Sequence, residues 1–225
     1  VMTFGIAESA LAKMLEKWED SLPEHMHLAY LPDQLTGVRL RLSVYDTTNE
    51  NAESEIDSKM SALKEILGDI LYSEEDDTLE ACIGRMLSAE GMTVSAAESC
   101  TGGLISSLLT SVPGASEYYL GSVTSYANSV KTGILGVPEN IIDEYGAVSR
   151  ECVSRMAEGI RRITGSDYSV ATSGIAGPGG GSEEKPVGLV WIGVSSKNGT
   201  EAYKMIFKGD RKRNIDRFAA NALNI

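Results

Sequence analysis

The sequence has 225 residues, of which 42% are apolar, and its 20 basic and 32 acidic side chains give a net charge of −12. This length and apolar content suffice for one large or two small globular domains and exclude a disordered chain. The negative charge disfavours binding to nucleic acid or anionic lipid, and no apolar segment reaches the roughly 18 residues that span a bilayer. The first residues also lack the basic-then-apolar pattern of a signal peptide, so we expect a cytoplasmic protein that contacts neither nucleic acid nor membrane.

The first third of the chain is expected to form a small α+β domain, residues 1–75. Residues 1–98 carry 7 basic and 20 acidic side chains, whereas residues 99–225 carry 13 and 12, so the acidity is local to the first part. The acidic segment Tyr72–Thr78 marks the domain boundary, although Thr78 can equally cap the following helix. Hydrophobic periodicity predicts, in order, a helix over Glu8–Asp20, strands over Met26–Leu31 and Val38–Tyr45, and a helix that contains Ile56, Met60, Leu63 and Leu67.

The second part, residues 76–225, is expected to be a layered α/β/α sheet. Strands and helices alternate along it, and glycine-rich turns join several strands to the helices that follow, a pattern typical of such layers. The expected elements are a helix over Leu79–Glu90, a strand over Met92–Ala97, a helix from Thr101, a strand over Tyr119–Tyr126, helices over Glu139–Tyr145 and Arg150–Thr164, strands over Tyr168–Ser173, Gly188–Ser195 and Glu201–Phe207, and a helix from Arg211.

Cysteine and histidine usage excludes several kinds of chemistry. The three cysteines, Cys82, Cys100 and Cys152, are an odd number without C-x-x-C spacing, so we expect reduced thiols and no zinc site. The two histidines, His25 and His27, have no nearby carboxylate or cysteine cluster, and we expect no metal there. Because residues 28–225 contain no histidine, a nucleophile in the second part needs a base other than a local imidazole.

A first candidate site is the segment AESCTGG, residues 97–103, where an apolar strand ends and a helix is expected to begin. A side chain at such a turn stands at the carboxyl edge of the sheet, beside helix N–H groups that have no acceptor within the helix. These donors suit a phosphate or the oxyanion of an acyl-transfer intermediate. The alternative, which the spacing alone favours, is that Ser99 or Thr101 only caps the helix and the glycines allow close packing.

A second candidate is SYANSVK, residues 125–131, again at a strand end before a helix. Tyr126 and Lys131 lie five residues apart, so a bend between them can direct the phenol and the amine to one point. Without a histidine nearby, a lysine that burial keeps neutral, assisted by the tyrosine hydroxyl, is the available general base for a serine. The alternative, favoured on this segment alone, is that Asn128 caps a helix and Lys131 is solvated.

A third candidate is SGIAGPGGGS, residues 173–182, directly after an apolar strand. Its glycines expose backbone N–H groups that suit a phosphate or carboxylate, and Lys185 and Arg211 can add positive charge. The segment is neither a P-loop, because no G-K-[ST] ends it, nor a Rossmann turn, because it opens into another strand. A flexible hairpin without a ligand is an equal alternative.

Taken together, five ordered motifs closely resemble the C-terminal domain of the CinA (competence/damage-inducible) family. They are AAESCTGG (96–103), SYANSVK (125–131), YGAVS (145–149), SGIAGPGGGSEEKPVG (173–188) and GDR (209–211). The resemblance covers about residues 77–225, and several motifs in order are far more specific than any one of them. It implies an amidase domain over residues 76–225, preceded by a KH-like α+β domain over residues 1–75. The family includes nicotinamide-nucleotide amidases, which hydrolyse the carboxamide of nicotinamide mononucleotide to nicotinic acid mononucleotide and ammonia.

The resemblance implies Ser99 as nucleophile, with Tyr126 and Lys131 completing a Ser-Tyr-Lys triad. Neutral Lys131 would take the serine proton directly or through Tyr126. We place the oxyanion at N–H groups near residues 101–103 and the phosphate at the glycine-rich loop with Arg211, and the reverse assignment stays open. The substrate-binding candidates are Thr101, Gly102, Gly103, Asn128, Ser173, Gly177, Gly179, Gly180, Gly181 and Arg211.

The expected partner is the small-molecule substrate, bound by a homo-oligomer without cofactor or metal. In longer family members an N-terminal domain carries ADP-ribose pyrophosphatase activity; the sequence starts at Val1 without that domain, so we expect this chain to lack that activity. The alternative function is a non-catalytic nucleotide-sensing or protein-recruiting module linked to competence or DNA damage, which the intact Ser99, Tyr126 and Lys131 disfavour. RNA binding by the KH-like segment is disfavoured by its negative charge and its lack of a G-x-x-G loop, and a spacer or dimerisation role is expected instead.

Overall fold

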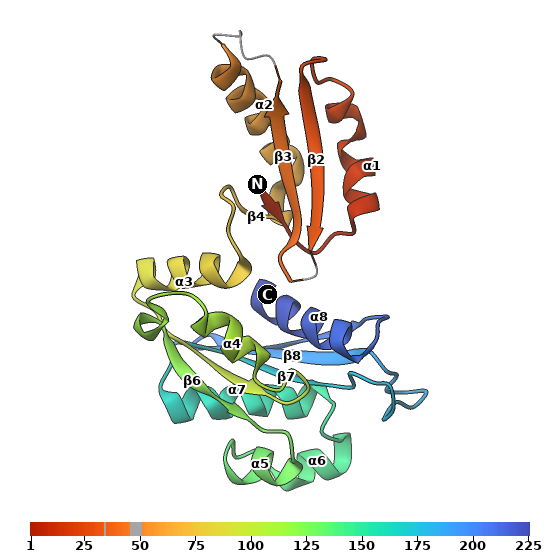
Figure 1. Ribbon diagram of the computed structural model, residues 1–225. Coiled ribbons are helices and arrows are strands. Elements are labelled where there is room, and N and C mark those ends of the chain that lie inside the picture. Colours follow the sequence, from red (N-terminus) through yellow and green to blue (C-terminus); the bar gives the residue numbers. More distant parts are fainter. Residues whose placement is uncertain (34, 46–50) are drawn as a thin grey trace. The chain divides into compact units, whose positions relative to one another are not determined.

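Two separate β-sheets organise the chain in a computed structural model that describes residues 1–33, 35–45 and 51–225 (Figure 1). Contacts within the chain divide it into two units, Val1–Cys82 and Ile83–Ile225. Both units combine helices with a sheet, so the fold class is mixed α/β, as the sequence predicts.

The first unit contains a four-stranded antiparallel sheet in the order β2-β3-β1-β4. Val38 and Leu40 alternate along β3 and are buried in one apolar cluster with residues of both α1 and α2. The two helices therefore cover the same face of the sheet. The elements are β1 (Met2–Thr3), α1 (Glu8–Glu19), β2 (Met26–Asp33), β3 (Gly37–Val44), α2 (Ala52–Leu67) and β4 (Leu71–Ser73).

Two strands of this sheet, β1 and β4, are absent from the sequence-based prediction. They have two and three residues, too few for alternation to be recognised. Strand β1 is held by pairing with β3 and β4, and β4 is held by pairing with β1. Tyr72 and Ser73, which the sequence assigned to an acidic hinge, belong to β4. At the other end of that segment, Thr78 acts as a helix cap, because its Oγ1 accepts a hydrogen bond of 3.3 Å from the N–H of Ala81.

The second unit contains a five-stranded sheet in the order β6-β5-β7-β8-β9. Strand β5 runs parallel to its neighbours β6 and β7, whereas β8 and β9 continue the sheet antiparallel. Every residue of β5 is buried because the strand lies inside the sheet and is covered on both faces. The strands are β5 (Val94–Glu98), β6 (Tyr119–Thr124), β7 (Tyr168–Gly174), β8 (Leu189–Ser196) and β9 (Gly199–Ile206).

Helices cover both faces of the second sheet, as expected for an α/β/α layer. Helices α4 and α8 lie on one face, and α7 lies on the other with α5 and α6 beside it (Figure 1). Helix α7 shows why: Cys152, Met156 and Ile160 recur every four residues and are all buried against the sheet. The helices are α3 (Leu79–Glu90), α4 (Leu104–Thr110), α5 (Asn128–Gly133), α6 (Glu139–Tyr145), α7 (Arg150–Thr164) and α8 (Arg211–Asn224).

Helix α4 begins three residues later than predicted, at Leu104 instead of Thr101. The intervening residues form a turn in which Gly102 and Gly103 adopt φ values of +63° and +104°. Such values favour glycine, so the two glycines form the turn between β5 and α4 rather than the first turn of the helix. Within the described ranges, no helix is long and apolar enough to cross a membrane.

Candidate active site

The three candidate motifs follow three neighbouring parallel strands. In the sheet register, Glu98 of β5 pairs with Thr124 of β6 and with Thr172 of β7. The next residue in each strand direction is a serine, so Ser99, Ser125 and Ser173 come one position beyond that paired level. Because parallel strands end at the same edge of a sheet, the motifs meet there.

A cavity of about 220 Å³ lies at this edge. It brings together the proposed triad residues and part of the predicted substrate-binding set. Its lining consists of Ser99, Cys100, Tyr126, Asn128, Lys131, Ala147, Val148, Ser173, Gly174, Ala176 and Arg211.

Lys131 is the centre of the polar contacts in this cavity. Its side chain is only 1% exposed. The Nζ atom lies 3.1 Å from Ser99 Oγ, 2.5 Å from the main-chain oxygen of Ser125 and 3.3 Å from that of Tyr126. Helix α5 starts just before it, and because helical side chains lean toward the N-terminus, the amine is directed back to the end of β6.

The surroundings of Lys131 favour a neutral amine. Burial lowers the pKa of Lys131 below its ordinary value of 10.5, with the thiols of Cys152 and Cys100 acting weakly in the opposite direction. A neutral amine has two N–H groups and one lone pair. Two carbonyl oxygens can accept the two N–H groups, which leaves the lone pair for the hydroxyl proton of Ser99.

The two nearby cysteines are protonated thiols. Burial raises the pKa of the Cys100 thiol to about 12 and that of Cys152 to about 11. A thiol is a weak nucleophile compared with its thiolate, so Cys100 is poorly suited to attack although it lines the cavity. All three cysteines are free, in agreement with the reduced state predicted from the sequence.

Glu98 occupies the backbone N–H groups at the start of α4. Its side chain is 0% exposed. Oε2 accepts hydrogen bonds from the N–H groups of Gly103 at 2.9 Å and Ile105 at 3.1 Å, and Oε1 accepts from that of Ser106 at 2.8 Å. A carboxylate at a helix N-terminus satisfies donors that have no partner within the helix and opposes the positive end of the helix dipole.

This arrangement differs from the expected oxyanion site near residues 101–103. The N–H of Gly103 is bound to Glu98, and the N–H of Gly102 donates to the main-chain oxygen of Ser99 at 3.2 Å. Thr101 is buried, and its Oγ1 lies 2.8 Å from Oγ1 of Thr172. None of these three residues is among those that line the described cavity, because the turn directs them toward the helix and the adjacent strand.

Tyr126 contributes to the site in a different way from the one its spacing suggests. Its main-chain oxygen contacts Lys131, whereas its side chain is 65% exposed and its hydroxyl accepts a hydrogen bond of 3.3 Å from Arg211 Nη2. Asn128 lines the cavity but does not cap α5, because the N-cap residue is Ala127 and Asn128 is the first helical residue.

The glycine-rich loop touches the cavity only at its beginning. Ser173 is buried there, and its Oγ donates a hydrogen bond of 2.7 Å to the main-chain oxygen of Ala147. Gly177 has a φ of +89°, and a Cβ atom added to it would lie 2.6 Å from Val187. Gly177 is thus a packing position as well as a main-chain acceptor, receiving a 2.7 Å hydrogen bond from Arg211 Nη1. Among the residues that the structure describes, those that line the cavity do not include Gly177, Gly179, Gly180 or Gly181.

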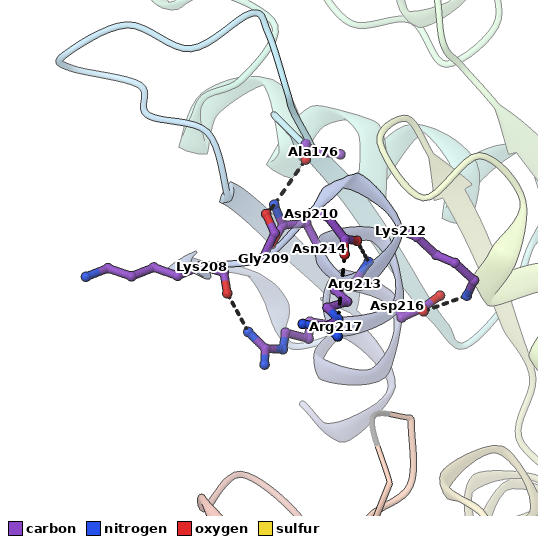
Figure 2. A network of polar contacts seen from close by, with 9 residues as sticks. All are labelled: Ala176, Lys208, Gly209, Asp210, Lys212, Arg213, Asn214, Asp216 and Arg217. Atoms are coloured by element: carbon purple, nitrogen blue, oxygen red, sulfur yellow. Dashed lines mark hydrogen bonds and ion pairs between the residues drawn. The ribbon is translucent and has the colours of Figure 1, made fainter.

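A network of hydrogen bonds links the start of α8 to the main chain of Ala176 and Gly209 (Figure 2). The side chain of Asp210 caps the helix by accepting a hydrogen bond of 2.9 Å from the N–H of Arg213. Asn214 is fully buried, and its Nδ2 donates to the main-chain oxygens of Ala176 and Gly209, each at 3.0 Å. Because Ala176 lines the cavity and Gly209 lies two residues before Arg211, Asn214 ties the cavity wall to the helix that carries the arginine.

Several contributors were missed at the level of the sequence. The main-chain oxygens of Ser125 and Tyr126 accept hydrogen bonds from Lys131, and because every residue has such an oxygen, the residue types do not predict these contacts. Ala147 and Val148 line the cavity from the segment before α7, and the only sequence signal for them is their place in the YGAVS motif. Among the residues that the structure describes, no group of three or more histidine, cysteine, aspartate or glutamate side chains is arranged to hold a metal ion.

Comparisons with known proteins give a consistent result for both units. A family model of the CinA C-terminal domain matches residues 76–225, and a model of the KH domain of the damage-inducible protein CinA matches residues 1–73. A CinA-like protein from Salinibacter ruber is 46% identical over 223 residues, which are 99% of this chain and 54% of the relative. Another CinA-like protein, from Cytophaga hutchinsonii, is 41% identical over 225 residues, 100% of this chain and 54% of the relative. The chain therefore spans about half the length of these curated relatives.

Solved structures support the same relationship. The crystal structure of competence/damage-inducible protein CihA from Agrobacterium tumefaciens is 38% identical, with a TM-score of 0.63, and the match covers 64% of this chain and 89% of that one. The competence damage-inducible protein A from Klebsiella pneumoniae is 34% identical, with a TM-score of 0.63 and coverage of 64% and 90%.

Proposed function

Because this chain belongs to the CinA family, we propose that its second unit is an amide hydrolase that converts nicotinamide mononucleotide to nicotinic acid mononucleotide and ammonia. The observation that carries the proposal is the 3.1 Å contact between Lys131 Nζ and Ser99 Oγ inside a cavity. A buried lysine with a lowered pKa next to a serine hydroxyl is a suitable pair of general base and nucleophile.

In the first step, neutral Lys131 takes the hydroxyl proton as Ser99 Oγ attacks the carboxamide carbon. The carbonyl oxygen becomes an oxyanion, and a new C–O bond forms. Cys100 directly follows the nucleophile and lines the cavity, so its backbone N–H lies next to the attacking oxygen. We assign the oxyanion to this N–H, and loss of one such donor typically costs about 3 kcal/mol of transition-state stabilisation.

In the second step, the carbon–nitrogen bond breaks. The Lys131 ammonium returns its proton to the departing nitrogen, so ammonia leaves and an ester to Ser99 remains. Water then attacks this ester with Lys131 again as base, and Ser99 recovers its proton as the carboxylic acid product is released. Lys131 contacts Ser99 directly, so this scheme needs no proton transfer through the Tyr126 hydroxyl.

Substrate size and charge agree with this assignment. The cavity of about 220 Å³ is smaller than the ~300–1,000 Å³ of sites that enclose whole drug-sized ligands, so it suits the carboxamide-bearing ring better than a complete nucleotide. The phosphate would then extend toward Arg211, whose guanidinium has five N–H donors and uses Nη1 and Nη2 in contacts with Gly177 and Tyr126.

The direct test is ammonia release from nicotinamide mononucleotide, nicotinamide riboside and free nicotinamide. We expect release from the mononucleotide, with a Ser99→Ala variant inactive but still able to bind it. Binding of the mononucleotide by the wild type without any ammonia release would instead support a nucleotide-sensing module.

A further inference from the structure

Glu98 is a second buried ionisable group beside the nucleophile, and the proposed mechanism gives it no proton to transfer. Its carboxylate accepts three backbone N–H groups of the turn and helix that follow Ser99. Its own main-chain oxygen accepts a hydrogen bond of 2.7 Å from the N–H of Ser125. Ser125 in turn offers its main-chain oxygen to Lys131 Nζ at 2.5 Å.

Glu98 thus contacts both halves of the nucleophile–base pair. Through its side chain it holds α4, and so the turn from residue 99 to 103 that carries Ser99. Through its main chain it holds the strand end that orients Lys131. We infer that Glu98 is a positioning residue that fixes the distance and direction between Ser99 Oγ and Lys131 Nζ, an inference that rests on the proposed hydrolysis only for its kinetic readout.

The charge of Glu98 suits this role because the donors already surround it. Two N–H groups reach Oε2 and one reaches Oε1, so an ionised carboxylate accepts from all three. Glutamine has the same shape, but its NH₂ group would replace one oxygen and face an N–H donor instead of accepting from it. The variant Glu98→Gln therefore loses one or two of the three hydrogen bonds without opening a void.

The effect on the reaction follows from the location of Glu98. It does not line the described cavity, so substrate contacts should survive the substitution. A small displacement of a nucleophile from its base lowers the chemical rate, and a shift of about 1 Å can cost about 100-fold. We expect kcat to fall about 10- to 100-fold in Glu98→Gln while KM changes less than about twofold.

Asp167→Asn is the matched control. Asp167 also accepts a hydrogen bond from a backbone N–H, that of Thr93 at 2.8 Å, but it lies just before β7, at the opposite end of that strand from Ser173. This variant removes a carboxylate that also accepts a backbone N–H in the same unit, but an exposed one away from the cavity, and should retain wild-type kcat. Thermal unfolding of both variants shows whether each is folded, and Glu98→Asp, which keeps the charge but draws the oxygens back, replaces Glu98→Gln if the latter does not fold.

A second readout separates this inference from the proposed function. Phenylmethylsulfonyl fluoride reacts with activated serines, and intact mass measures the rate of Ser99 modification without any substrate. A folded Glu98 variant that reacts about tenfold more slowly than the wild type, with Asp167→Asn unchanged, supports the positioning role even if the wild type releases no ammonia. A folded Glu98 variant with wild-type kcat and wild-type labelling rate would overturn it, as would equal losses in the Asp167 control.

Discussion

Replacing Lys131 by arginine separates a proton-accepting amine from a fixed positive charge. The amine is enclosed by Ser99 Oγ and two main-chain oxygens at 3.1, 2.5 and 3.3 Å. Arginine keeps the charge and the hydrogen-bond donors, but its pKa leaves it protonated at every working pH, so it has no lone pair for the serine proton. If Lys131 is the base, the Lys131→Arg variant is expected to lose general-base catalysis completely.

The size of the loss can be estimated. A positioned general base contributes about 10²- to 10⁴-fold to the rate, which corresponds to about 3–5 kcal/mol at 1.36 kcal/mol for each factor of ten. Arginine is also larger than lysine, and with the side chain 1% exposed it must displace its neighbours, at a cost of about 1–3 kcal/mol in stability. Activity must therefore be compared at a temperature where both proteins are shown to be folded.

The assay is kcat for ammonia release, with Lys131→Met as the control. Methionine has a similar length and no charge, so it removes the base without adding volume, although it leaves the oxygens of Ser125 and Tyr126 without their donor. Both variants should be nearly inactive. A Lys131→Arg protein with kcat within a few-fold of the wild type would refute the reasoning, because the lysine would then act only as a cation and the base would have to be sought elsewhere, first at Tyr126.

Three further predictions concern the same site. Because the pKa of Lys131 is lowered and its neutral form is the reactive one, kcat should rise with pH through a midpoint below 10.5, and a pH-independent kcat would contradict this. The free energy of unfolding of the wild type should also rise relative to that of Lys131→Met between that lowered pKa and 10.5, because the folded protein no longer buries an ammonium group there. Cys100→Ala should retain kcat within about threefold, since a thiol with a pKa of about 12 is not ionised, and a dead Cys100 variant beside an active Ser99→Ala would identify the thiol as the nucleophile. Asn214→Leu should raise KM about tenfold for the mononucleotide but not for the riboside, because Ala176 and Gly209 lose their donor and Arg211 loses its support; equal effects on both substrates would place the phosphate elsewhere.

The sequence was most informative where one face of an element is buried. In α7, apolar residues at helical spacing predict both ends of the helix, Arg150 and Thr164, in agreement with the structure. Strand β5 illustrates the opposite case. All five of its residues are buried, so no alternation of apolar and polar residues shows which face of the sheet each side chain occupies. The role of the Glu98 carboxylate at the start of α4 could therefore not be predicted from the pattern.

At the candidate site, the sequence predicted which residues take part better than it predicted which of their atoms make contact. The lack of histidine in residues 28–225 directed attention to Lys131, and the structure places its amine against Ser99. The five-residue spacing between Tyr126 and Lys131 suggested that the phenol and the amine converge, but α5 starts at Asn128 and only the main chain of Tyr126 meets the lysine. A contact made by a backbone oxygen does not depend on the type of side chain, so it cannot be predicted from residue types.

The burial of Lys131 has a practical consequence for handling the protein. Reagents that couple amines to a solid support attack exposed lysines in their neutral form, and Lys13, Lys17 and Lys197 are exposed. Burial lowers the pKa of Lys131, but the residue is only 1% exposed, so a bulky activated ester cannot reach its amine. Immobilisation through surface amines should thus leave the cavity chemically intact.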